Sequence, residues 1–530
     1  MKLVVDLTRC QGYGQCVYAA PETFRMHGGE ALMYDPSPGD EQRDKVVRAA
    51  AACPVRAIVL DAADGRAAAI PRPRAARADG WTGRIVIVGA SLAGLRAANA
   101  LRSEGFDGPL TIIGDEPYEP YDRVPLSKQA LTGSVSPLST EFPFTGGLDA
   151  DPVLGHPAVG LDRRSRRVLL ASGEQVEYGR LLIATGARAE PWPNAQEAAL
   201  EGVCTVRGRG DAARLRERLA AGPGRVLVIG AGFIGSEIAS ACRDLGLPVT
   251  VVERGPTPLA GALGATLGRI AARMHQEAGV DLRCGMAVTA LEGDSEGRLR
   301  RARLSDGSTL DVGLAVAALG SRRNVEWLEG SGLAAGRWGV TCDAGCRAFD
   351  VNGVVTDDVF VAGDVARFPN PVYGFQLLAV EHWGNAVDQA EIAAHNMITG
   401  GTDRWPHLAL PVFWSTQFGT QIKSVGVPTC ADEVVITQGS VDDRRLVAAY
   451  GRHGRMTAAV TFDHGMWLEF YGRLIEQAAP FPPRFAIVDQ SPGRSQVLPA
   501  QIPQARPGQA TVVLTGHQPS DRRAVLVHGG

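Results

Sequence analysis

The chain has 530 residues, 45% of them hydrophobic and 64 of them glycine, a composition that fits a globular α/β protein. Its 54 basic and 57 acidic residues give a net charge of −3, which argues against a general nucleic-acid-binding protein. No apolar run reaches the roughly 18 residues that a membrane helix needs, and nine cysteines are too few for a disulfide scaffold. We therefore expect a cytoplasmic protein. Its length suggests about three or four domains.

The first predicted element is an iron–sulfur site. Cys10, Cys16 and Cys53 keep the ligand spacing of bacterial ferredoxins, CxxCxxC with a remote Cys-Pro pair, but Tyr13 stands at the second ligand position. Three thiolates can hold three irons, whereas a phenol with a pKa near ~10 is a poor ligand at neutral pH. The pattern therefore predicts a [3Fe-4S] cluster, with [4Fe-4S] less favoured. Three unrelated structural cysteines are the alternative interpretation.

The segment that carries these cysteines, residues 1–62, resembles the small bacterial ferredoxins that serve cytochromes P-450, in which the position of Tyr13 is variable. The resemblance implies a small α+β ferredoxin module. Residues 63–82 are rich in alanine, arginine and proline and have no amphipathic period, which is typical of a semi-flexible linker. A docking patch made by their arginines is the alternative.

The next predicted unit is a dinucleotide-binding fold. RIVIVGASLAGLRAANALRSEGF (84–106) has the pattern of a buried strand, a glycine-rich turn and a helix. Gly89 and Gly94 keep two positions of the GxGxxG motif, and Ser91 replaces the middle glycine. The following strand ends at Asp115 and Glu116. In such a unit the helix N-terminus faces a pyrophosphate and the acid takes a ribose hydroxyl, although a purely structural βαβ turn is the alternative.

A second dinucleotide-binding fold is predicted at GRVLVIGAGFIGSEIASACRDLGLPVTVVERG (224–255), which fits the glycine motif fully at Gly230, Gly232 and Gly235. Glu253 ends the strand that follows the helix. A carboxylate there accepts a hydrogen bond from the adenosine 2′-hydroxyl and repels a 2′-phosphate, which favours NADH. Arg254 keeps NADPH as the alternative.

Further strings carry a family resemblance: PYDRVPLSK (120–128), LLIATGA (181–187), AALGSRRNVEWL (317–328), VFVAGDVARF (359–368), AVEHWGNA (379–386) and LPVFWSTQFGTQIKSVG (410–426). Together with the two glycine motifs they resemble the bacterial ferredoxin reductases of the glutathione-reductase structural class, from about residue 84 to 480. The resemblance implies two Rossmann-like domains, one for FAD and one for NAD, followed by an α+β interface domain.

The same resemblance implies roles for individual residues. Phe233 matches a residue beside the flavin–nicotinamide stack, and Glu237 matches one that can pair with Lys128 near the flavin N5 edge. These three are the predicted catalytic residues, with helix–sheet packing as the alternative for Phe233 and core packing for Trp383. The predicted cofactor-binding residues are Gly89, Ser91, Gly94, Asp115, Glu116, Arg123, Lys128, Thr185, Gly186, Gly230, Gly232, Ile234, Gly235, Glu253, Gly320, Gly363, Asp364, Glu381, His382 and Trp383.

In the interface domain, Trp414 is expected near the cofactors, and Thr416 replaces an aspartate that is common in the family. Residues 486–530 carry scattered proline, glycine, glutamine and arginine and are expected to be a poorly ordered tail. The predicted domains are a ferredoxin module (1–62), a linker (63–82), an FAD-binding domain (83–201 and 326–406), an NAD-binding domain (202–325), an interface domain (407–485) and the tail (486–530).

The cysteine positions exclude one related activity. Disulfide reductases of this fold place a CxxxxC pair beside the flavin, but no cysteine lies between Cys53 and Cys204. Cys342 and Cys346 lie elsewhere and are expected to be structural. An NADH oxidase or peroxide-reducing enzyme would usually need a redox-active cysteine near the flavin, so that activity is not favoured.

The expected function is an NADH:ferredoxin oxidoreductase fused to its own ferredoxin. Electrons would pass from NADH through FAD and the cluster to a separate oxygenase, with a cytochrome P-450 expected and a Rieske-type oxygenase as the alternative. A redox-sensing flavoprotein is a hypothesis of a different class. Asp6 interrupts the apolar stretch of a signal peptide, which agrees with a cytoplasmic location. We expect a monomer or weak homodimer with no nucleic-acid partner and no membrane insertion.

Overall fold

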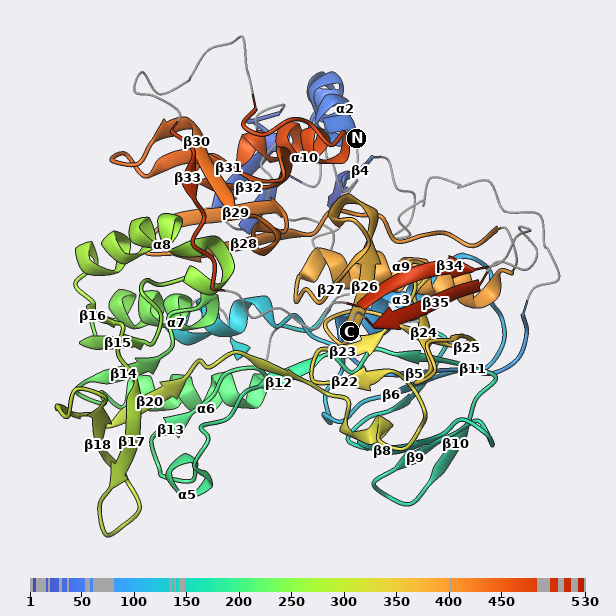
Figure 1. Ribbon diagram of the computed structural model, residues 1–530, viewed down its shortest axis with the longest axis horizontal. Helices are drawn as coiled ribbons and strands as arrows, with labels where there is room; N and C mark the ends of the chain where they lie inside the picture. The colour runs from blue at the N-terminus through green and yellow to red at the C-terminus, as the bar shows by residue number, and fades with distance from the viewer. Residues whose placement is uncertain are drawn as a thin grey trace.

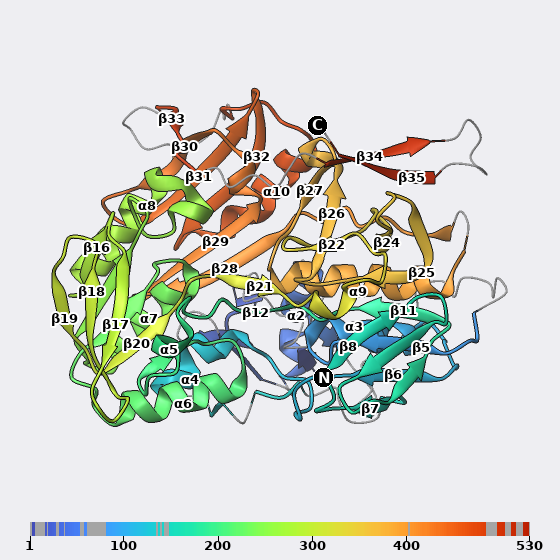
Figure 2. The same ribbon diagram turned by 60° about the horizontal axis from the view of Figure 1, so that its bottom comes forward.

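Four sheets of five or six strands carry the architecture of the protein in the computed structural model (Figure 1). Helices cover one face of each of two of these sheets, and the sheet that includes β28 (Val412–Gln417) and β33 (Leu498–Pro499) lies above α8 (Ala260–Glu277) in Figure 2. The structure describes residues 3–5, 16–17, 20–27, 31–35, 38–52, 58–60, 81–133, 136–137, 140–142, 148–400, 403–483, 496–503, 510–515 and 523–528.

The first large sheet has the strand order β24-β25-β11-β5-β6-β7 and is parallel except for β24. All four residues of β5 and of β6 are buried, because α3 and α9 cover one face and the small antiparallel sheet β8–β10 covers the other. The bounds are β5 Ile85–Val88, α3 Leu92–Ser103, β6 Leu110–Ile113, β7 Asp151–Val153, β8 Ala158–Asp162, β9 Arg167–Leu170, β10 Gln175–Glu177, β11 Arg180–Ile183, β24 Arg347–Phe349, β25 Val355–Val361 and α9 Trp383–Ile398.

The second large sheet is parallel and has the order β13-β20-β14-β15-β16. It is inserted into the first unit through two short strands, β12 (Ala187–Ala189) and β21 (Ser321–Arg323), which pair antiparallel with each other. The bounds are β13 Val203–Cys204, α6 Arg209–Ala220, β14 Val226–Ile229, α7 Phe233–Asp244, β15 Val249–Glu253, α8 Ala260–Glu277, β16 Asp281–Cys284, β17 Val288–Gly293, β18 Leu299–Leu304, β19 Thr309–Asp311 and β20 Leu314–Ala317.

The interface domain is an antiparallel sheet with the order β28-β29-β32-β31-β30-β33 and the helix α10 packed on one face. Its other face packs on α8 of the inserted domain, where Tyr450 is fully buried and its hydroxyl donates to the carbonyl of Leu263. The bounds are β28 Val412–Gln417, β29 Thr420–Gly426, β30 Glu433–Ser440, β31 Arg445–Arg452, β32 Arg455–Phe462, α10 Leu468–Glu476 and β33 Leu498–Pro499. The two Rossmann-like domains and the α+β C-terminal domain confirm the predicted fold class, while the domain boundaries stay predictions.

The C-terminal segment differs from the expected poorly ordered tail. In its described parts, β33 pairs with β30, and the strands β34 (Ala510–Thr515) and β35 (Arg523–His528) form a hairpin on the edge of β27 (Gln376–Leu378). Ala500 is fully buried against α8, and Thr266 Oγ1 donates to the carbonyl of Pro499 at 2.7 Å. Short strands of this segment therefore pair with edge strands of two sheets. Such long-range pairing cannot be predicted from the local composition of the segment.

That hairpin extends a fourth sheet of the order β22-β23-β26-β27-β34-β35. It includes β22 (Ala335–Gly336), β23 (Gly339–Thr341) and β26 (Ala366–Asn370). The described part of the N-terminal module holds the strand pairs β1 with β4 and β2 with β3, and the helix α2. The bounds are β1 Leu3–Val5, β2 Phe24–His27, β3 Ala31–Tyr34, α2 Arg43–Ala52 and β4 Ile58–Leu60.

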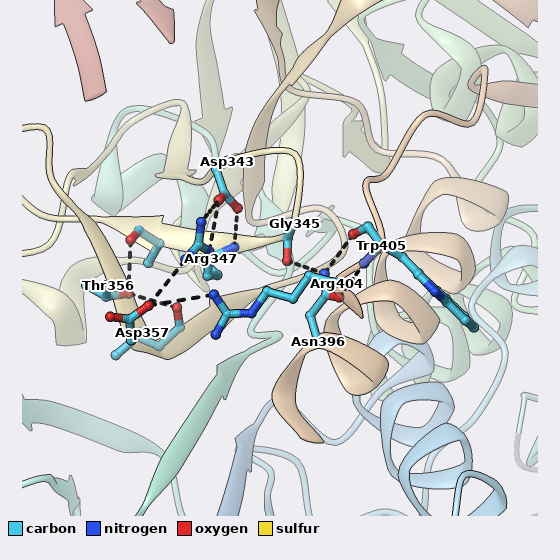
Figure 3. A network of polar contacts seen from close by, with 10 residues as sticks. Asp343, Gly345, Arg347, Thr356, Asp357, Asn396, Arg404 and Trp405 are labelled. Carbon is cyan, nitrogen blue, oxygen red and sulfur yellow. Dashed lines mark hydrogen bonds and ion pairs between the residues drawn. The ribbon is translucent and has the colours of Figure 1, made fainter. Parts of the chain in front are cut away.

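A polar network holds the C-terminal end of α9 against the first sheet (Figure 3). Arg347 binds Asp343 through Nε and Nη2, at 2.9 and 2.8 Å, and reaches Asp357 at 3.2 Å. Asn396 on α9 donates to the carbonyls of Gly345 and Trp405, at 2.9 and 2.8 Å. These contacts fix the helix whose other end carries Glu381, His382 and Trp383.

Candidate functional site

The turn after β5 is closed by two glycines. Gly89 has φ +126°, and a Cβ there would lie 2.1 Å from the carbonyl oxygen of Ala184. A Cβ at Gly94 would lie 1.9 Å from the carbonyl oxygen of Gly89. Ser91 is the N-cap residue of α3, and its Oγ accepts a 3.4 Å hydrogen bond from Arg123. The turn therefore has the tight geometry that a dinucleotide pyrophosphate requires, with Ser91 at the helix N-terminus.

The two acids after β6 have different surroundings. Asp115 is exposed, whereas the Glu116 carboxylate binds Arg123 at 2.7 Å and accepts a hydrogen bond from the Tyr121 hydroxyl. Tyr121 is buried, and burial raises its pKa to about 12, so it stays a donor at neutral pH. The structure thus joins Glu116 to Arg123 and leaves Asp115 facing solvent at the end of the strand.

An arginine that the sequence did not single out lies beside Asp364. Arg207 Nη2 is 2.6 Å from Asp364 Oδ2, and its Nε donates to the carbonyl of Ala187 on β12. Burial opposes the charged guanidinium, but Asp364 and Glu381 outweigh it and raise the pKa of Arg207. Gly363 has φ +81°, and its N–H donates to Gln389 on α9 at 2.9 Å. The carboxylate–guanidinium pair therefore lies just beyond the carboxyl end of β25, at the edge where the parallel strands of the first sheet end.

Thr185 and Gly186 follow β11 and are held by the segment that returns from the inserted domain. Thr185 Oγ1 donates to the carbonyl of Asn324, and Asn324 Nδ2 donates to the carbonyl of Thr185, both at 2.8 Å. Gly186 has φ +62° and accepts from the Asn324 N–H at 3.1 Å. Gly320, in the turn before β21, has φ +103° and is exposed.

The second glycine turn, after β14, is closed in the same way. Cβ atoms at Gly230 and Gly235 would lie 2.4 Å from the Ala318 oxygen and 2.0 Å from the Gly230 oxygen. A Cβ at Gly232 would meet no atom within 4 Å, so the backbone there is open to a close ligand. Ile234, the next but one residue, is 43% exposed.

Glu253 closes the same turn from the end of β15. Its carboxylate accepts hydrogen bonds from the N–H groups of Ala231 and Gly255, at 2.7 and 2.6 Å. Arg254 is exposed beside it. The carboxylate is thus placed against the glycine motif, where a ribose 2′-hydroxyl would lie in a dinucleotide site of this kind.

A buried carboxylate joins the two glycine-rich domains. Glu237 on α7 is 3% exposed, and Lys128 Nζ lies 3.0 Å from its Oε2. Ser127 Oγ donates to the same oxygen at 2.5 Å, and Ser415 Oγ, from β28, donates to Oε1 at 2.5 Å. The structure therefore brings together the expected Lys128–Glu237 pair and adds two hydroxyl groups that the sequence did not indicate.

Aromatic side chains line both sides of β28. Phe233 and Phe413 are in contact, with ring centroids 4.0 Å apart, and the His382 ring lies 5.3 Å from Phe413. Trp383 and Trp414 lie edge to face at 6.3 Å, and Trp383 also donates to the Asp122 carboxylate. Burial lowers the pKa of His382 to about 4. Phe233 and His382 thus both contact Phe413, which the sequence did not indicate, while Trp383 contacts Trp414 on the other side of the strand.

The structure describes the two cysteines that were expected to be structural, but only one of the three expected cluster ligands. Cys342 and Cys346 are fully buried, and burial raises the pKa of both thiols, which agrees with a structural role. Cys16 is 8% exposed. Cys10, Tyr13 and Cys53 lie outside the described residues, and the residues that are described hold no group of three or more His, Cys, Asp or Glu side chains placed to bind a metal ion.

These features fit two dinucleotides. Each glycine turn admits no side chain at its closed positions, and the turn at Gly232 is open to a ligand. Arg207, Asp364 and Lys128 are charged groups that could hold the flavin nucleotide, and Glu253 could hold the adenosine ribose of the coenzyme.

The chain matches three protein families over successive ranges. Residues 3–60 match a 4Fe-4S single cluster domain, residues 83–390 match pyridine nucleotide-disulphide oxidoreductases, and residues 412–493 match the reductase C-terminal domain.

Similar proteins cover most of the chain. Rhodocoxin reductase of Rhodococcus erythropolis is 35% identical over 68% of this chain and 81% of its own. The ferredoxin–NAD(+) reductase component of the anthranilate 1,2-dioxygenase system of Burkholderia cepacia is 32% identical over 76% of this chain and 96% of its own. The covalent putidaredoxin reductase–putidaredoxin complex superimposes with a TM-score of 0.70 and 26% identity, over 75% of this chain and 94% of that one.

Within the part of the chain that the structure describes, no helix combines the length and the apolar character needed to cross a bilayer.

Proposed function

This chain belongs to the pyridine nucleotide-disulphide oxidoreductase family, and we propose that it is an FAD-dependent NADH:ferredoxin reductase fused to its own ferredoxin. One observation carries the proposal: a single cluster domain, a two-dinucleotide oxidoreductase and a reductase C-terminal domain occur in one polypeptide. A one-electron carrier covalently joined to a hydride-accepting enzyme points to electron delivery, and the separate acceptor would be an oxygenase.

Bound FAD would supply a hydride acceptor that can also release electrons singly. The chain's own residues would bind and orient it. Gly89 and Gly94 let the backbone approach the pyrophosphate, and the Arg207–Asp364 pair would contact the flavin nucleotide. Lys128, held by Glu237, would supply a fixed cation, and the Phe233–Phe413 pair would limit water at the nicotinamide side.

The coenzyme is proposed to be NADH. The support is Glu253, whose carboxylate is oriented by the N–H groups of Ala231 and Gly255 and would repel a 2′-phosphate. Arg254 is the residue that would favour NADPH instead.

The cluster is proposed to be [3Fe-4S], held by Cys10, Cys16 and Cys53. The support is Tyr13 at the second ligand position, because a neutral phenol is a poor iron ligand. Anaerobically purified protein should then contain about three irons per cluster and give the EPR signal of an oxidised [3Fe-4S] centre, and Tyr13→Cys should convert the site toward [4Fe-4S]. Four irons in a diamagnetic oxidised cluster would contradict the assignment.

The acceptor is proposed to be a cytochrome P-450, because the N-terminal module resembles the ferredoxins that serve such enzymes. A Rieske-type oxygenase is the second candidate, since one relative is the reductase component of a dioxygenase system. The predicted domain boundaries, a cytoplasmic location and a monomer or weak homodimer complete the proposal.

An anaerobic titration with NADH tests the proposed function as a whole. The flavin absorbance should bleach, and the cluster signal should then change within the same protein. In a rapid-mixing experiment, the rate of cluster reduction should not depend on protein concentration, because a tethered module has a millimolar effective concentration. A cluster that stays oxidised while the flavin is fully reduced would rule the proposal out.

A further inference from the structure

Ser415 belongs to the interface domain but contacts the buried carboxylate of the inserted domain. Its Oγ lies 2.5 Å from Glu237 Oε1, and both side chains are almost fully buried, at 1% and 3% exposure. Lys128 and Ser127 bind the other oxygen, Oε2. The two oxygens of the Glu237 carboxylate are therefore bound by side chains from different domains.

The Ser415 hydroxyl is oriented by a second buried residue of the same strand. Gln417 Nε2 donates to Ser415 Oγ at 3.0 Å, and Gln417 is fully buried. An amide NH₂ group can only donate, so the single proton of the Ser415 hydroxyl is directed at Glu237. The result is a chain of donors that ends on the carboxylate.

The strand that carries Ser415 is fixed along α7. Phe413 packs on Phe233, four residues before Glu237, and the N–H of Phe418 donates to Ser240 Oγ at 2.8 Å. Contacts on both sides of Ser415 thus hold β28 in register with the helix face that carries Glu237. The hydroxyl is a fixed donor with little freedom to move away.

We propose that Ser415 is a positioning residue for hydride transfer, acting through Glu237 on Lys128; this inference rests on the proposed function. Among the described residues, Ser415 is the hydrogen-bond donor to Glu237 Oε1. A buried acceptor that loses its donor costs more than the net gain of one hydrogen bond, so Ser415→Ala should leave the Glu237 carboxylate less firmly held beside Lys128. Lys128 would then lose the fixed counter-charge that holds its ammonium group in place.

The experiment uses the FAD-loaded full-length protein and four variants: Ser415→Ala, Ser415→Thr, Glu237→Gln and the double variant S415A/E237Q. In Ser415→Ala, flavin reduction by NADH should slow on the order of tenfold, with little change in NADH affinity. The flavin midpoint potential should also shift. Ser415→Thr keeps the hydroxyl and should restore both values toward wild type.

The double variant distinguishes action through Glu237 from a general effect. Once Glu237 is an amide, Ser415→Ala should change neither the rate nor the midpoint potential further. Ser424→Ala is the matched control, because it removes a buried hydroxyl from the neighbouring strand β29. It should leave the potential unchanged.

The inference would be overturned by an unchanged potential and rate in Ser415→Ala, or by an effect that adds fully to that of Glu237→Gln. A Ser415→Ala protein that only unfolds at a lower temperature, with the wild-type potential, would show a purely structural role and count against it. Failure of the wild-type holoprotein to be reduced by NADH would instead overturn the proposed function, so the two failures are distinguishable.

Discussion

Arg207 and Asp364 form an ion pair with 2.6 Å between Nη2 and Oδ2, although 157 residues separate them in the chain. Arg207 follows β13 of the inserted domain, and Asp364 follows β25 of the first sheet. The pair therefore connects the two dinucleotide-binding units at the edge where the flavin nucleotide is expected. Its side chains are partly exposed, at 29% and 18%, which leaves both groups accessible to a ligand.

Replacing Arg207 should weaken FAD binding. Arg207→Ala removes the cation that neutralises Asp364 and that would contact the nucleotide, and a hydrogen bond to a charged group is worth about 1.5–3 kcal/mol. The dissociation constant of FAD, measured by titrating apoprotein, should rise about 10- to 100-fold. Arg322→Ala is the control, because its ion pair with Glu190 is exposed and should contribute little. Equal effects in the two variants would contradict a role for Arg207 in the flavin site.

Breaking the Lys128–Glu237 pair should destabilise the protein. Lys128→Met leaves the buried Glu237 carboxylate without a cation, and breaking a buried pair costs about 3–5 kcal/mol. Chemical denaturation should show this loss, and flavin reduction by NADH should slow in the same variant. The double variant with Glu237→Gln should recover much of the stability, whereas Arg301→Met, which breaks an exposed pair with Asp311, should have little effect. A fully stable Lys128→Met protein would argue against an ionised pair.

Glu253 should make NADH the preferred coenzyme. A 2′-phosphate would lose a hydrogen bond and gain repulsion, together worth on the order of 2–4 kcal/mol, so kcat/KM should favour NADH by about 30- to 1,000-fold. Glu253→Gln removes the charge and should lower the ratio of kcat/KM for NADH to kcat/KM for NADPH. Steady-state kinetics with both coenzymes measure this ratio. Equal efficiency in the wild-type protein would show that Arg254 dominates, and Arg254→Ala would then restore the preference for NADH.

Removing a cluster ligand should separate the two halves of the electron path. Cys16→Ala should abolish reduction of cytochrome c but leave flavin reduction by NADH and direct ferricyanide reduction largely intact, because those steps bypass the cluster. Cys204→Ala is the control, since Cys204 lies on β13 of the inserted domain and is not a predicted ligand. Normal electron delivery to a cognate oxygenase by Cys16→Ala would show that the cluster is not on the route.

Buried histidines should make the fold sensitive to acid. Burial lowers the pKa of His275 and of His407 to about 4, below the roughly 6.5 of an unfolded chain. Between these values the unfolded state binds more protons, so stability falls as the pH falls from about 6.5 toward 4. At pH 5 each histidine should cost about 2 kcal/mol relative to its contribution at neutral pH.

His275→Phe tests this pH dependence, because it keeps a ring against Phe418 and removes the titrating group. The free energy of unfolding, measured by denaturant at pH 7 and pH 5, should fall about 2 kcal/mol less in this variant than in the wild type. His156→Asn changes an exposed histidine and should not alter the dependence. An identical loss in wild type and His275→Phe would contradict the assignment.

Local patterns predicted the parts of the site that depend on the backbone. Gly89, Gly94, Gly230 and Gly235 could be assigned because a glycine motif between a strand and a helix has one geometry. The pairing of Lys128 with Glu237 came from the family resemblance. In each case a short string was sufficient, because the constraint lies within a few residues or within a known motif.

Arg207 and Ser415 could not be found in this way, because their partners are distant in the chain. Arg207 lies in a loop with no motif of its own. In β28, alternation places Phe413, Ser415 and Gln417 on the side that faces α7. The sequence alone does not show which face of the strand meets the helix, and the family resemblance points to Trp414 and Thr416 instead. A serine in a strand of alternating polar and apolar residues is normally predicted to face solvent, so its burial against α7 becomes known only from the structure.

The coenzyme-binding domain is attached to the rest of the chain through β12 and β21, which run side by side with Ala187 opposite Arg323 and Ala189 opposite Ser321. The chain therefore leaves the flavin sheet and returns to it one strand spacing apart, about 5 Å. A replacement domain whose own ends lie that close would fit the same two attachment points without cutting the flavin sheet. Such an exchange would also have to preserve the contacts that α7 and α8 make with the other two domains, at Glu237, Ser240 and Leu263.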